Sequence, residues 1–340
     1  GSLALNYSIY NVHGELLGQI SSNSEAGVAM GFAGIGKIVI DSGGFSNPFG
    51  TVEDISYRTI LDTVVAAAPA PEVITYTITD NDGDTSSSTL TLNNIIDDIA
   101  GTAANNIING TARNENISGL VGDDTINAGA GYDVVRGGDG NDSIDGGADD
   151  DQLYGNAGND TISGGTGKDQ IYGDAGNDTL NGNDGDDFTS GGAGNDTING
   201  GAGNDVIIGG AGDDSLTGGL GADVFKWELV DQGAKLSPAK DIVTDFDSVA
   251  GNLGGDVLDL RDLLVGENTG NLANYLHFEK SVSGLDTIIH VSSNGEFANG
   301  FNASKDVQTI TLNNVDLIQS FTNDQDIVAD LISKQKLITD

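Results

Sequence analysis

Aspartate recurs at a fixed interval through the middle of this chain of 340 residues. From residue 124 onward, every ninth residue is an aspartate for twelve consecutive places, without an insertion or a deletion. The series consists of Asp124, Asp133, Asp142, Asp151, Asp160, Asp169, Asp178, Asp187, Asp196, Asp205, Asp214 and Asp223. Carboxylates are ligands of hard cations, and Ca²⁺ takes about six to eight oxygens from carboxylates and main-chain carbonyls. The series therefore predicts a row of calcium sites.

Each of these aspartates is the sixth residue of a nonapeptide, and the units run from residue 101 to residue 226. Glycine is frequent at the first, second and fourth places, and the eighth place is apolar in every unit except that of Thr189. The first two units hold Asn106 and Glu115 at the sixth place, so we expect residues 101–118 to form a cap without a strong ion site. A flexible acidic linker would not keep this register, and we therefore expect an ordered structure.

The spacing predicts a parallel solenoid. A short strand with one inward apolar side chain, followed by a glycine-rich turn, makes half a coil, because glycine accepts the positive φ angles of tight turns. Two nonapeptides then close one coil, and neighbouring coils stack at about 4.8 Å. Asp124 and Asp142 would stack on one edge, and Asp133 and Asp151 on the other. Stacked pairs of this kind provide for about ten calcium ions, whereas magnesium should fit poorly because it demands tighter octahedral geometry.

Calcium should be required for this segment to fold. Its inward side chains are few and small, whereas ordering the backbone costs about 1–2 kcal/mol per residue. Repulsion among stacked carboxylates would add to that cost in the absence of a cation. We therefore expect the segment to be disordered without calcium and to fold as calcium binds.

The charge of the chain limits its partners. It has 52 acidic and 13 basic residues, which gives a formal net charge of −39. Nucleic acid and anionic membrane surfaces are not expected as partners, because both would be repelled. The sequence has no cysteine, which excludes disulfides and thiolate metal sites, and no apolar run long enough for membrane insertion. We expect a monomer.

The sequence offers no catalytic machinery, and we do not expect an enzyme. HExxH, GxSxG and P-loop motifs are missing from it. The histidines His13, His277 and His290 are far apart in the sequence and share no metal-ligand spacing. We interpret them as ordinary surface or strand residues.

The expected fold class is all-β, with the solenoid flanked on both sides. Residues 1–68 alternate apolar and polar side chains, and we interpret them as part of a ligand-binding β-sandwich. Residues 69–100 read as a linker followed by a hairpin. Residues 101–226 form the solenoid, and residues 227–340 form a β-rich cap that ends in a short helix.

Seven further aspartates outside the repeat are candidate calcium ligands. Three alternate in the turn of the predicted hairpin, and four surround two predicted strands after the repeat. They are Asp80, Asp82 and Asp84 in the hairpin and Asp245, Asp247, Asp256 and Asp259 after the repeat. The first group lacks the glycine spacing and the final glutamate of an EF-hand loop. Plain acidic turns and solvated loops are the alternative interpretation for both groups.

The nonapeptide fits the pattern G-G-x-G-x-D-x-U-x, and the segment resembles the repeats of RTX proteins. The resemblance implies a calcium-bound parallel β-roll over residues 101–226.

The flanking segments carry a second resemblance. GGLGADVFKW (218–227), DIVTDFD (241–247) and GGDVLDLRDLL (254–264) resemble the C-terminal region of large bacterial RTX adhesins. The hairpin ITYTITDNDGDTSSSTLTL looks like the last strands of their Ig-like modules. This resemblance implies a module at the C-terminal end of a surface adhesin, exported unfolded by a type I secretion apparatus and folded by extracellular calcium. It further implies a secretion signal at about 290–340 and an adhesion ligand, of unknown identity, bound within 1–68 or upstream.

Two alternatives remain open. The chain could be the tail of a secreted RTX hydrolase or toxin whose catalytic domain lies upstream. It could also be an ice-binding β-solenoid, since the seventh and ninth places of alternate units form two polar rows. These rows are Thr125, Ser143, Thr161, Thr179, Thr197 and Ser215, and Asn127, Asp145, Ser163, Asn181, Asn199 and Thr217.

Overall fold

The predicted all-β fold class is confirmed by the computed structural model. The structure describes residues 5–11, 16–22, 35–41, 72–79, 85–92, 97–233, 237–249, 251, 254–268, 270–318 and 321–338. Within these residues α1 (Asp324–Ser333) is the one α-helix, and no helix is long and apolar enough to cross a membrane.

Two small antiparallel sheets precede the solenoid in the sequence. The first has the order β2-β1-β3, and the second is the hairpin of β4 and β5, in which Glu72 pairs with Leu92. Their strands are β1 (Leu5–Asn11), β2 (Leu16–Ser22), β3 (Ile35–Asp41), β4 (Glu72–Thr79) and β5 (Thr85–Leu92).

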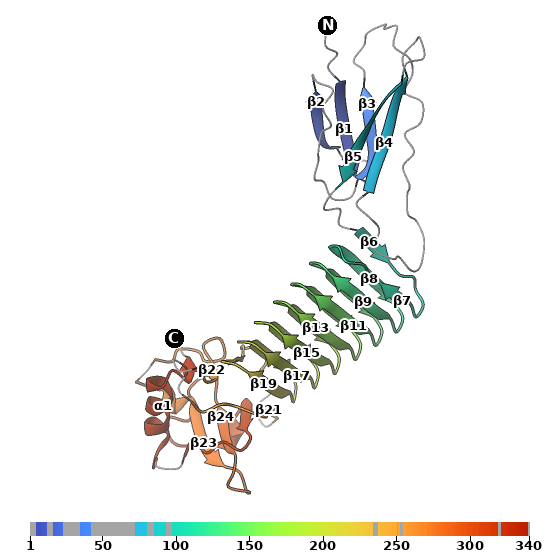
Figure 1. The fold of residues 1–340 in the computed structure, drawn as a ribbon. Helices are drawn as coiled ribbons and strands as arrows, with labels where there is room; N and C mark the ends of the chain where they lie inside the picture. Colours follow the sequence, from blue (N-terminus) through green and yellow to red (C-terminus); the bar gives the residue numbers. More distant parts are fainter. Residues whose placement is uncertain are drawn as a thin grey trace.

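Two long sheets form a parallel β-solenoid of about seven turns (Figure 1). Strands alternate between the sheets along the chain, so each sheet takes every second nonapeptide. The first sheet contains β6 (Asp97–Ala100), β8 (Glu115–Val121), β10 (Val134–Asp139), β12 (Gln152–Ala157), β14 (Gln170–Ala175), β16 (Phe188–Ala193), β18 (Val206–Ala211), β20 (Val224–Lys226), β22 (Val257–Asp259) and β26 (Leu337–Ile338). The second contains β7 (Ile107–Asn109), β9 (Thr125–Ala130), β11 (Ser143–Ala148), β13 (Thr161–Thr166), β15 (Thr179–Asp184), β17 (Thr197–Ala202), β19 (Ser215–Leu220), β21 (Ala239–Val243), β25 (Gln308–Leu312), β24 (Thr287–Val291) and β23 (Leu276–Lys280).

The strand register equals two nonapeptides. Ile144 pairs with Ile162 in the second sheet, and Val135 pairs with Leu153 in the first. Every place of the repeat therefore stacks on the same place of the next coil. This register is what converts a nine-residue sequence interval into continuous rows of like side chains.

The glycines of the repeat occur where the backbone turns. The second and fourth places adopt positive φ angles, as Gly138 (121°) and Gly140 (141°) do in one turn. Where glycine is replaced at the second place, the substitutes include Asn156 and Asp174, which also have positive φ. Asparagine and aspartate tolerate this left-handed region better than most residues. The turn geometry therefore explains why glycine, asparagine and aspartate recur at these places of the repeat.

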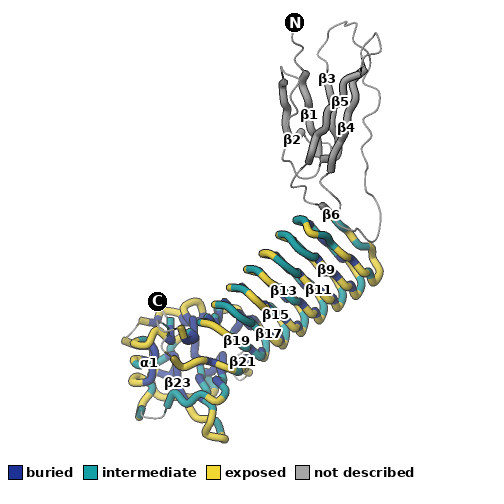
Figure 2. Tube along the Cα trace, in the orientation of Figure 1, coloured by how far each residue is buried: buried dark blue, intermediate teal, exposed yellow. Residues whose placement is uncertain are grey.

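The interior of the solenoid is narrow. The eighth-place side chains are fully buried, as for Leu153, Ile171, Leu180 and Ile198. Along the solenoid, buried segments alternate with exposed ones in every coil (Figure 2). Each strand contributes one such apolar side chain, and the first-place glycine two residues later is also buried. So thin a core buries little apolar surface for each residue that it orders, which leaves a large stabilising contribution to be made at the edges.

Thr189 is the exception in the apolar column, and its hydroxyl is buried. The side chain is fully covered, and its Oγ1 has no hydrogen-bond partner among the described residues. Leaving a buried hydroxyl unpaired costs about 1–3 kcal/mol. Thr189→Val should therefore stabilise the folded solenoid by about 1 kcal/mol or more, measured as a higher thermal midpoint at saturating calcium. Thr179→Val, at an exposed place, serves as the control, and a lower midpoint for Thr189→Val would contradict the expectation.

The C-terminal cap extends both sheets of the solenoid. β21 continues the second sheet by pairing in parallel with β19, and β22 and β26 continue the first sheet beyond β20. β25, β24 and β23 then complete the second sheet, the last two by antiparallel pairing. Trp227 is fully buried where the solenoid meets the cap. Together these contacts cover the open end of the apolar column.

Helix α1 packs on the cap with one apolar face. The side chain of Asn323 caps its N-terminus by accepting a hydrogen bond from the Asp326 amide. Ile327, Val328 and Leu331 are buried, and Ile332 is partly buried against the same core. The helix leads directly into β26, which places the C-terminal segment against the end of the first sheet.

Candidate metal centre

The twelve sixth-place aspartates line the two edges of the solenoid, where each turn enters a strand. Each is at most 2 % exposed. One row, termed edge A, contains Asp124, Asp142, Asp160, Asp178, Asp196 and Asp214. The other row, termed edge B, contains Asp133, Asp151, Asp169, Asp187, Asp205 and Asp223. The structure thus brings the aspartates into two rows with the spacing of the sequence series.

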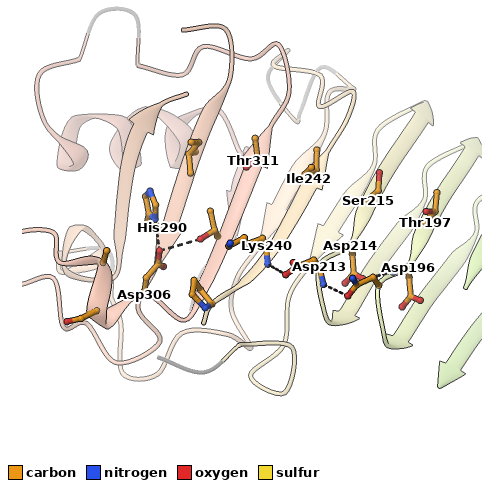
Figure 3. Close-up of a pocket in the computed structure, with 16 residues that line it drawn as sticks. Asp196, Thr197, Asp213, Asp214, Ser215, Lys240, Ile242, His290, Asp306 and Thr311 are labelled. Atoms are coloured by element: carbon orange, nitrogen blue, oxygen red, sulfur yellow. Dashed lines mark hydrogen bonds and ion pairs between the residues drawn. The ribbon is translucent and has the colours of Figure 1, made fainter. Parts of the chain in front are cut away.

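One oxygen of each carboxylate is used in joining coils. Oδ1 of Asp142 accepts a hydrogen bond of 2.7 Å from the main-chain amide of Asp124, and Oδ1 of Asp160 accepts one of 2.7 Å from Asp142. The same bond repeats along both edges. On edge A, the last such bond within the repeat joins the amide of Asp196 to Oδ1 of Asp214 (Figure 3). These bonds fix the orientation of every carboxylate in the row.

The second oxygen has no such partner. Within the described part of the chain, Oδ2 of all twelve aspartates is buried and makes no hydrogen bond. A buried carboxylate oxygen that is neither hydrogen-bonded nor paired with a cation is strongly unfavourable. Twelve such oxygens in two regular rows give each edge the unsatisfied negative oxygens that would hold cations.

First-place glycines leave room for these oxygens. A Cβ added at Gly173 would lie under 3.0 Å from Oδ2 of Asp178 and 2.6 Å from the carbonyl oxygen of Gly191 in the next coil. At Gly155 the equivalent carbonyl, that of Gly173, lies 2.8 Å away. Carboxylate and carbonyl oxygens of adjacent coils therefore converge beside these glycines. This is the oxygen-only donor set that Ca²⁺ prefers.

Side chains alone do not complete a site. Across the described residues, no group of three or more His, Cys, Asp or Glu side chains is arranged to hold a metal ion. A cation at these edges would consequently be held by carboxylates together with main-chain carbonyls. Such mixed coordination is ordinary for calcium and unusual for zinc, which prefers His and Cys ligands.

Burial raises the pKa of the edge carboxyls in the chain without a bound cation. The pKa is raised to about 8 for Asp133 and to about 7 for Asp151, Asp160, Asp196 and Asp205. Loss of hydration is the main cause, and repulsion from neighbouring carboxylates adds to it, while main-chain hydrogen bonds act in the opposite direction. A bound divalent cation would stabilise the ionised carboxylates and would therefore lower these pKa values.

The close packing beside the first-place glycines leads to a prediction. In Gly173→Ala the new methyl group would displace the carboxylate of Asp178 or separate two coils. We expect the calcium midpoint of folding to rise by about tenfold, measured by far-UV circular dichroism during calcium titration. Thr179→Ala, at an exposed place in β15, the next strand along the chain, is the control. Its calcium titration should match that of the unaltered chain. Equal midpoints for the two variants would contradict the expectation.

The aspartates predicted outside the repeat have different surroundings. Asp80, Asp82 and Asp84 lie outside the described residues. Asp245 accepts hydrogen bonds of 2.9 Å from the amides of Gly218 and Gly219.

Asp256 lies on edge B beyond the repeat. Its Oδ1 accepts a hydrogen bond of 3.1 Å from the amide of Asp223, and its Oδ2 accepts one from the amide of Asp247. The carboxylate of Asp247 accepts from the amide of Val249. Asp259 is paired through both oxygens with Arg261, at 3.0 and 2.7 Å, and this pairing keeps its pKa below the usual range. Its carboxylate is therefore neutralised by arginine.

Asp241 continues edge A and was not among the predicted ligands. Its Oδ1 accepts a hydrogen bond of 3.0 Å from the amide of Asp214, as in the preceding coils. Its Oδ2 accepts from Nε1 of Trp227 at 2.7 Å and from Nε2 of Gln308 at 2.6 Å. Asp241 follows Asp214 by 27 residues, whereas the eighteen-residue register would have placed residue 241 after Asp223 on edge B. The interval of the repeat therefore does not identify its place.

Two of the histidines lie on strands, as the sequence led us to expect: His277 on β23 and His290 on β24. His277 and His290 pair across β23 and β24, with ring centroids 5.9 Å apart, and both contact the ring of Phe301. His277 bonds Asp324 at the start of α1, and His290 bonds Asp306. Antiparallel pairing brings them together, which their sequence separation does not reveal. His13 lies outside the described residues.

The two polar rows considered for ice binding are in register on the outer face of the second sheet. Thr161 pairs with Thr179, and Asn181 pairs with Asn199. Beyond Ser215 the row continues with Ile242, and a groove of about 970 Å³ follows between the last coils and the cap (Figure 3). The regular polar surface is therefore confined to the solenoid.

Fold and site together define a parallel β-roll whose edges are built for calcium. The RTX calcium-binding nonapeptide repeat family matches residues 100–135, 118–153, 133–162, 154–189 and 190–225. The chain therefore contains RTX repeats, and repeats of this family bind calcium. Proteins that carry them are typically secreted from the cell.

Three of the solved structures that are similar to this chain belong to an epimerase and a lipase. Two are solution structures of the AlgE6R3 and AlgE6R2 subunits of the mannuronan C5-epimerase from Azotobacter vinelandii. They are 26% and 23% identical, cover 56% and 51% of this chain and 78% and 88% of their own, and have TM-scores of 0.26 and 0.28. The extracellular lipase LipA from Serratia marcescens is 16% identical over 72% of this chain and 40% of its own, with a TM-score of 0.25. No match was found among curated protein sequences.

Proposed function

We propose that this chain is a calcium-dependent folding and secretion module from the C-terminal end of a bacterial surface adhesin. The observation that carries the calcium part is the double row of buried carboxylates with an unpartnered Oδ2. Edge repulsion opposes folding where calcium is scarce, as it is inside a cell. The chain then stays unfolded, which suits passage through a narrow type I exporter.

Outside the cell, calcium neutralises the two edges and the β-roll forms. The extension of both sheets into the cap gives the C-terminal region, which would emerge first, a template on which the last coils can stack. Folding outside the exporter would prevent the chain from sliding back. The adhesin assignment is supported by the flanking segments that resemble RTX adhesins and by the hairpin of β4 and β5 before the roll. The module itself has no catalytic role in this proposal.

An export assay tests the secretion part. The full chain and the variant Asp160→Asn/Asp178→Asn/Asp196→Asn are expressed with a type I exporter, and the secreted fraction is followed over time. Loss of three edge A carboxylates should slow export, because folding no longer retains the emerged chain. The exposed fifth-place variant Asp123→Asn/Asp186→Asn/Asp213→Asn removes equal charge and is the control. Export of the edge variant at the unaltered rate would contradict the proposal that folding outside the cell prevents the chain from sliding back. It would leave the proposed calcium binding unaffected.

Two rival functions are separated by simple observations. A hydrolase or toxin tail would be revealed by a catalytic domain in the sequence upstream of residue 1. The in-register rows of Thr and Asn on the second sheet favour ice binding as the other candidate. Thermal hysteresis measured with calcium present would support ice binding, and its loss on Thr161→Tyr/Thr179→Tyr would assign it to these rows.

A further inference from the structure

A buried lysine lies at the end of edge B. Lys336, next to β26, is 1 % exposed, although lysine is rarely buried to this extent. Its ammonium donates hydrogen bonds to the main-chain carbonyls of Asp256, at 2.7 Å, and of Asp247. It also lies 5.0 Å from the centroid of the Phe246 ring. Main-chain carbonyls and an aromatic face thus surround the charge in place of water.

These contacts place the ammonium at the main chain of Asp256, the residue that carries the last carboxylate of the row. Asp256 accepts the amide of Asp223 through Oδ1, which is the bond that joins successive coils along edge B. A Cβ added at Gly255 would lie 2.5 Å from Nζ of Lys336, so the glycine before Asp256 makes space for the ammonium. A glycine beside each edge aspartate makes space in the same way for the carboxylate oxygen.

The repeat ends at Asp223, and the next carboxylate of edge B comes from the cap. Beside Gly200, the carbonyl of Gly218 in the next coil lies near Oδ2 of Asp205. Beside Gly218 the three nearest atoms all belong to Asp223. The nonapeptides thus end here, while a buried carboxylate, Asp256, still follows on edge B. A buried carboxylate requires a positive partner.

We propose that the ammonium of Lys336 is a built-in cation that closes edge B after its last calcium place. It would neutralise Asp256 and bind the carbonyls of the cap as an ion would, without consuming a further calcium. The C-terminal segment would thereby lock onto the end of the β-roll. This inference rests on the proposed calcium-driven folding of the roll.

Edge A ends differently, which gives an internal comparison. Its terminal carboxylate, Asp241, is held by neutral donors from Trp227 and Gln308, together with the amide of Asp214. The terminal carboxylate of edge B accepts two main-chain amides, and a charged side chain, that of Lys336, bonds the main-chain carbonyl of the same residue. Removal of the Lys336 charge should therefore weaken the junction through edge B and leave the contacts of edge A in place.

Calcium titrations of the full chain test the proposal. Trp227 is the single tryptophan and is buried at the junction, so its fluorescence reports the cap, while far-UV circular dichroism reports the roll. Lys336→Met keeps the length of the side chain and removes its charge, and the calcium midpoint of the fluorescence change should rise about tenfold or more. Lys336→Arg keeps the charge and should remain within about threefold of the unaltered chain. Lys334→Met, at an exposed lysine, is the matched control and should leave the midpoint unchanged.

Each outcome decides one question. Equal calcium midpoints for Lys336→Met and the unaltered chain would overturn the inference. Equal increases of the midpoint in Lys336→Met and Lys336→Arg would show that the packing of the side chain matters and its charge does not, which would also overturn the inference. If Lys336→Met does not fold at any calcium concentration, Lys336→Met/Asp256→Asn is compared with it; recovery supports charge pairing, and no recovery overturns it. An unaltered chain that folds without calcium would instead contradict the proposed function, which separates the two failures.

Discussion

Asp160→Asn/Asp178→Asn/Asp196→Asn is expected to prevent the β-roll from folding at calcium concentrations that fold the unaltered chain. All three carboxylates are buried on edge A, and each has an unpartnered Oδ2. Asparagine retains an oxygen for the amide of the preceding coil but replaces the charged ligand with a neutral amide. Calcium affinity depends strongly on ligand charge, so the midpoint should rise by about tenfold or more for the triple variant.

The matched control changes the same charge on the exposed side of the turns. Asp123, Asp186 and Asp213 are fifth-place residues, and the oxygens of Asp123 and Asp186 accept amides of the next coil, as asparagine does at the same place in other units. Replacing these three with asparagine should leave the calcium midpoint within about threefold, because exposed charges are screened. Far-UV circular dichroism during calcium titration measures both variants. Similar shifts for the two would mean that general charge, and not edge coordination, controls folding.

The pH dependence of folding should have opposite signs with and without calcium. In the unfolded chain the edge carboxyls titrate near 3.8, whereas in the folded chain without a cation the pKa is raised to about 7 for Asp151, Asp160 and Asp196. Between these values the folded state holds protons that the unfolded state has released. Without calcium, the stability of the roll therefore falls as the pH rises from about 4 through about 7.

With calcium, protons compete with the ion for the same carboxylates. Calcium must displace protons from the unfolded chain, in which these carboxyls titrate near 3.8, so the calcium midpoint should rise as the pH is lowered, by about tenfold or more between pH 5.5 and pH 3.5. In chelator, by contrast, β-structure should increase over the same change of pH. Far-UV circular dichroism at a series of pH values measures both trends. A calcium midpoint that does not change between pH 5.5 and pH 3.5 would show that the edge carboxyls do not bind the ion.

The repeat could be predicted from sequence because one interval sets the whole geometry. Once the nine-residue phase of the aspartates is recognised, the register of eighteen residues and the two edges follow from strand geometry, and the structure has this register. Asp241 could not be placed in this way, because it follows Asp214 by 27 residues and the segment between them is not a single eighteen-residue coil. Extending the register past the last glycine-rich unit would have assigned residue 241 to edge B instead of edge A.

The cap could not be predicted in the same way, since its contacts join segments at irregular separations. Asp256 follows Asp223 by an interval that is not a multiple of nine, and Lys336 reaches it from the C-terminal segment through the pairing of β22 and β26. The pairing of His277 with His290 likewise depends on the register of an antiparallel hairpin. Such contacts depend on tertiary packing, which the local pattern does not encode.

The central claim is that calcium ions between buried carboxylates hold the β-roll together. The most direct measurement is the far-UV circular dichroism and small-angle scattering of the purified chain before and after exhaustive chelation, with magnesium as the control ion. The account predicts that the β-signal and the compact scattering profile are lost on chelation, return with calcium, and do not return with magnesium. A roll that stays compact and ordered after chelation would contradict it.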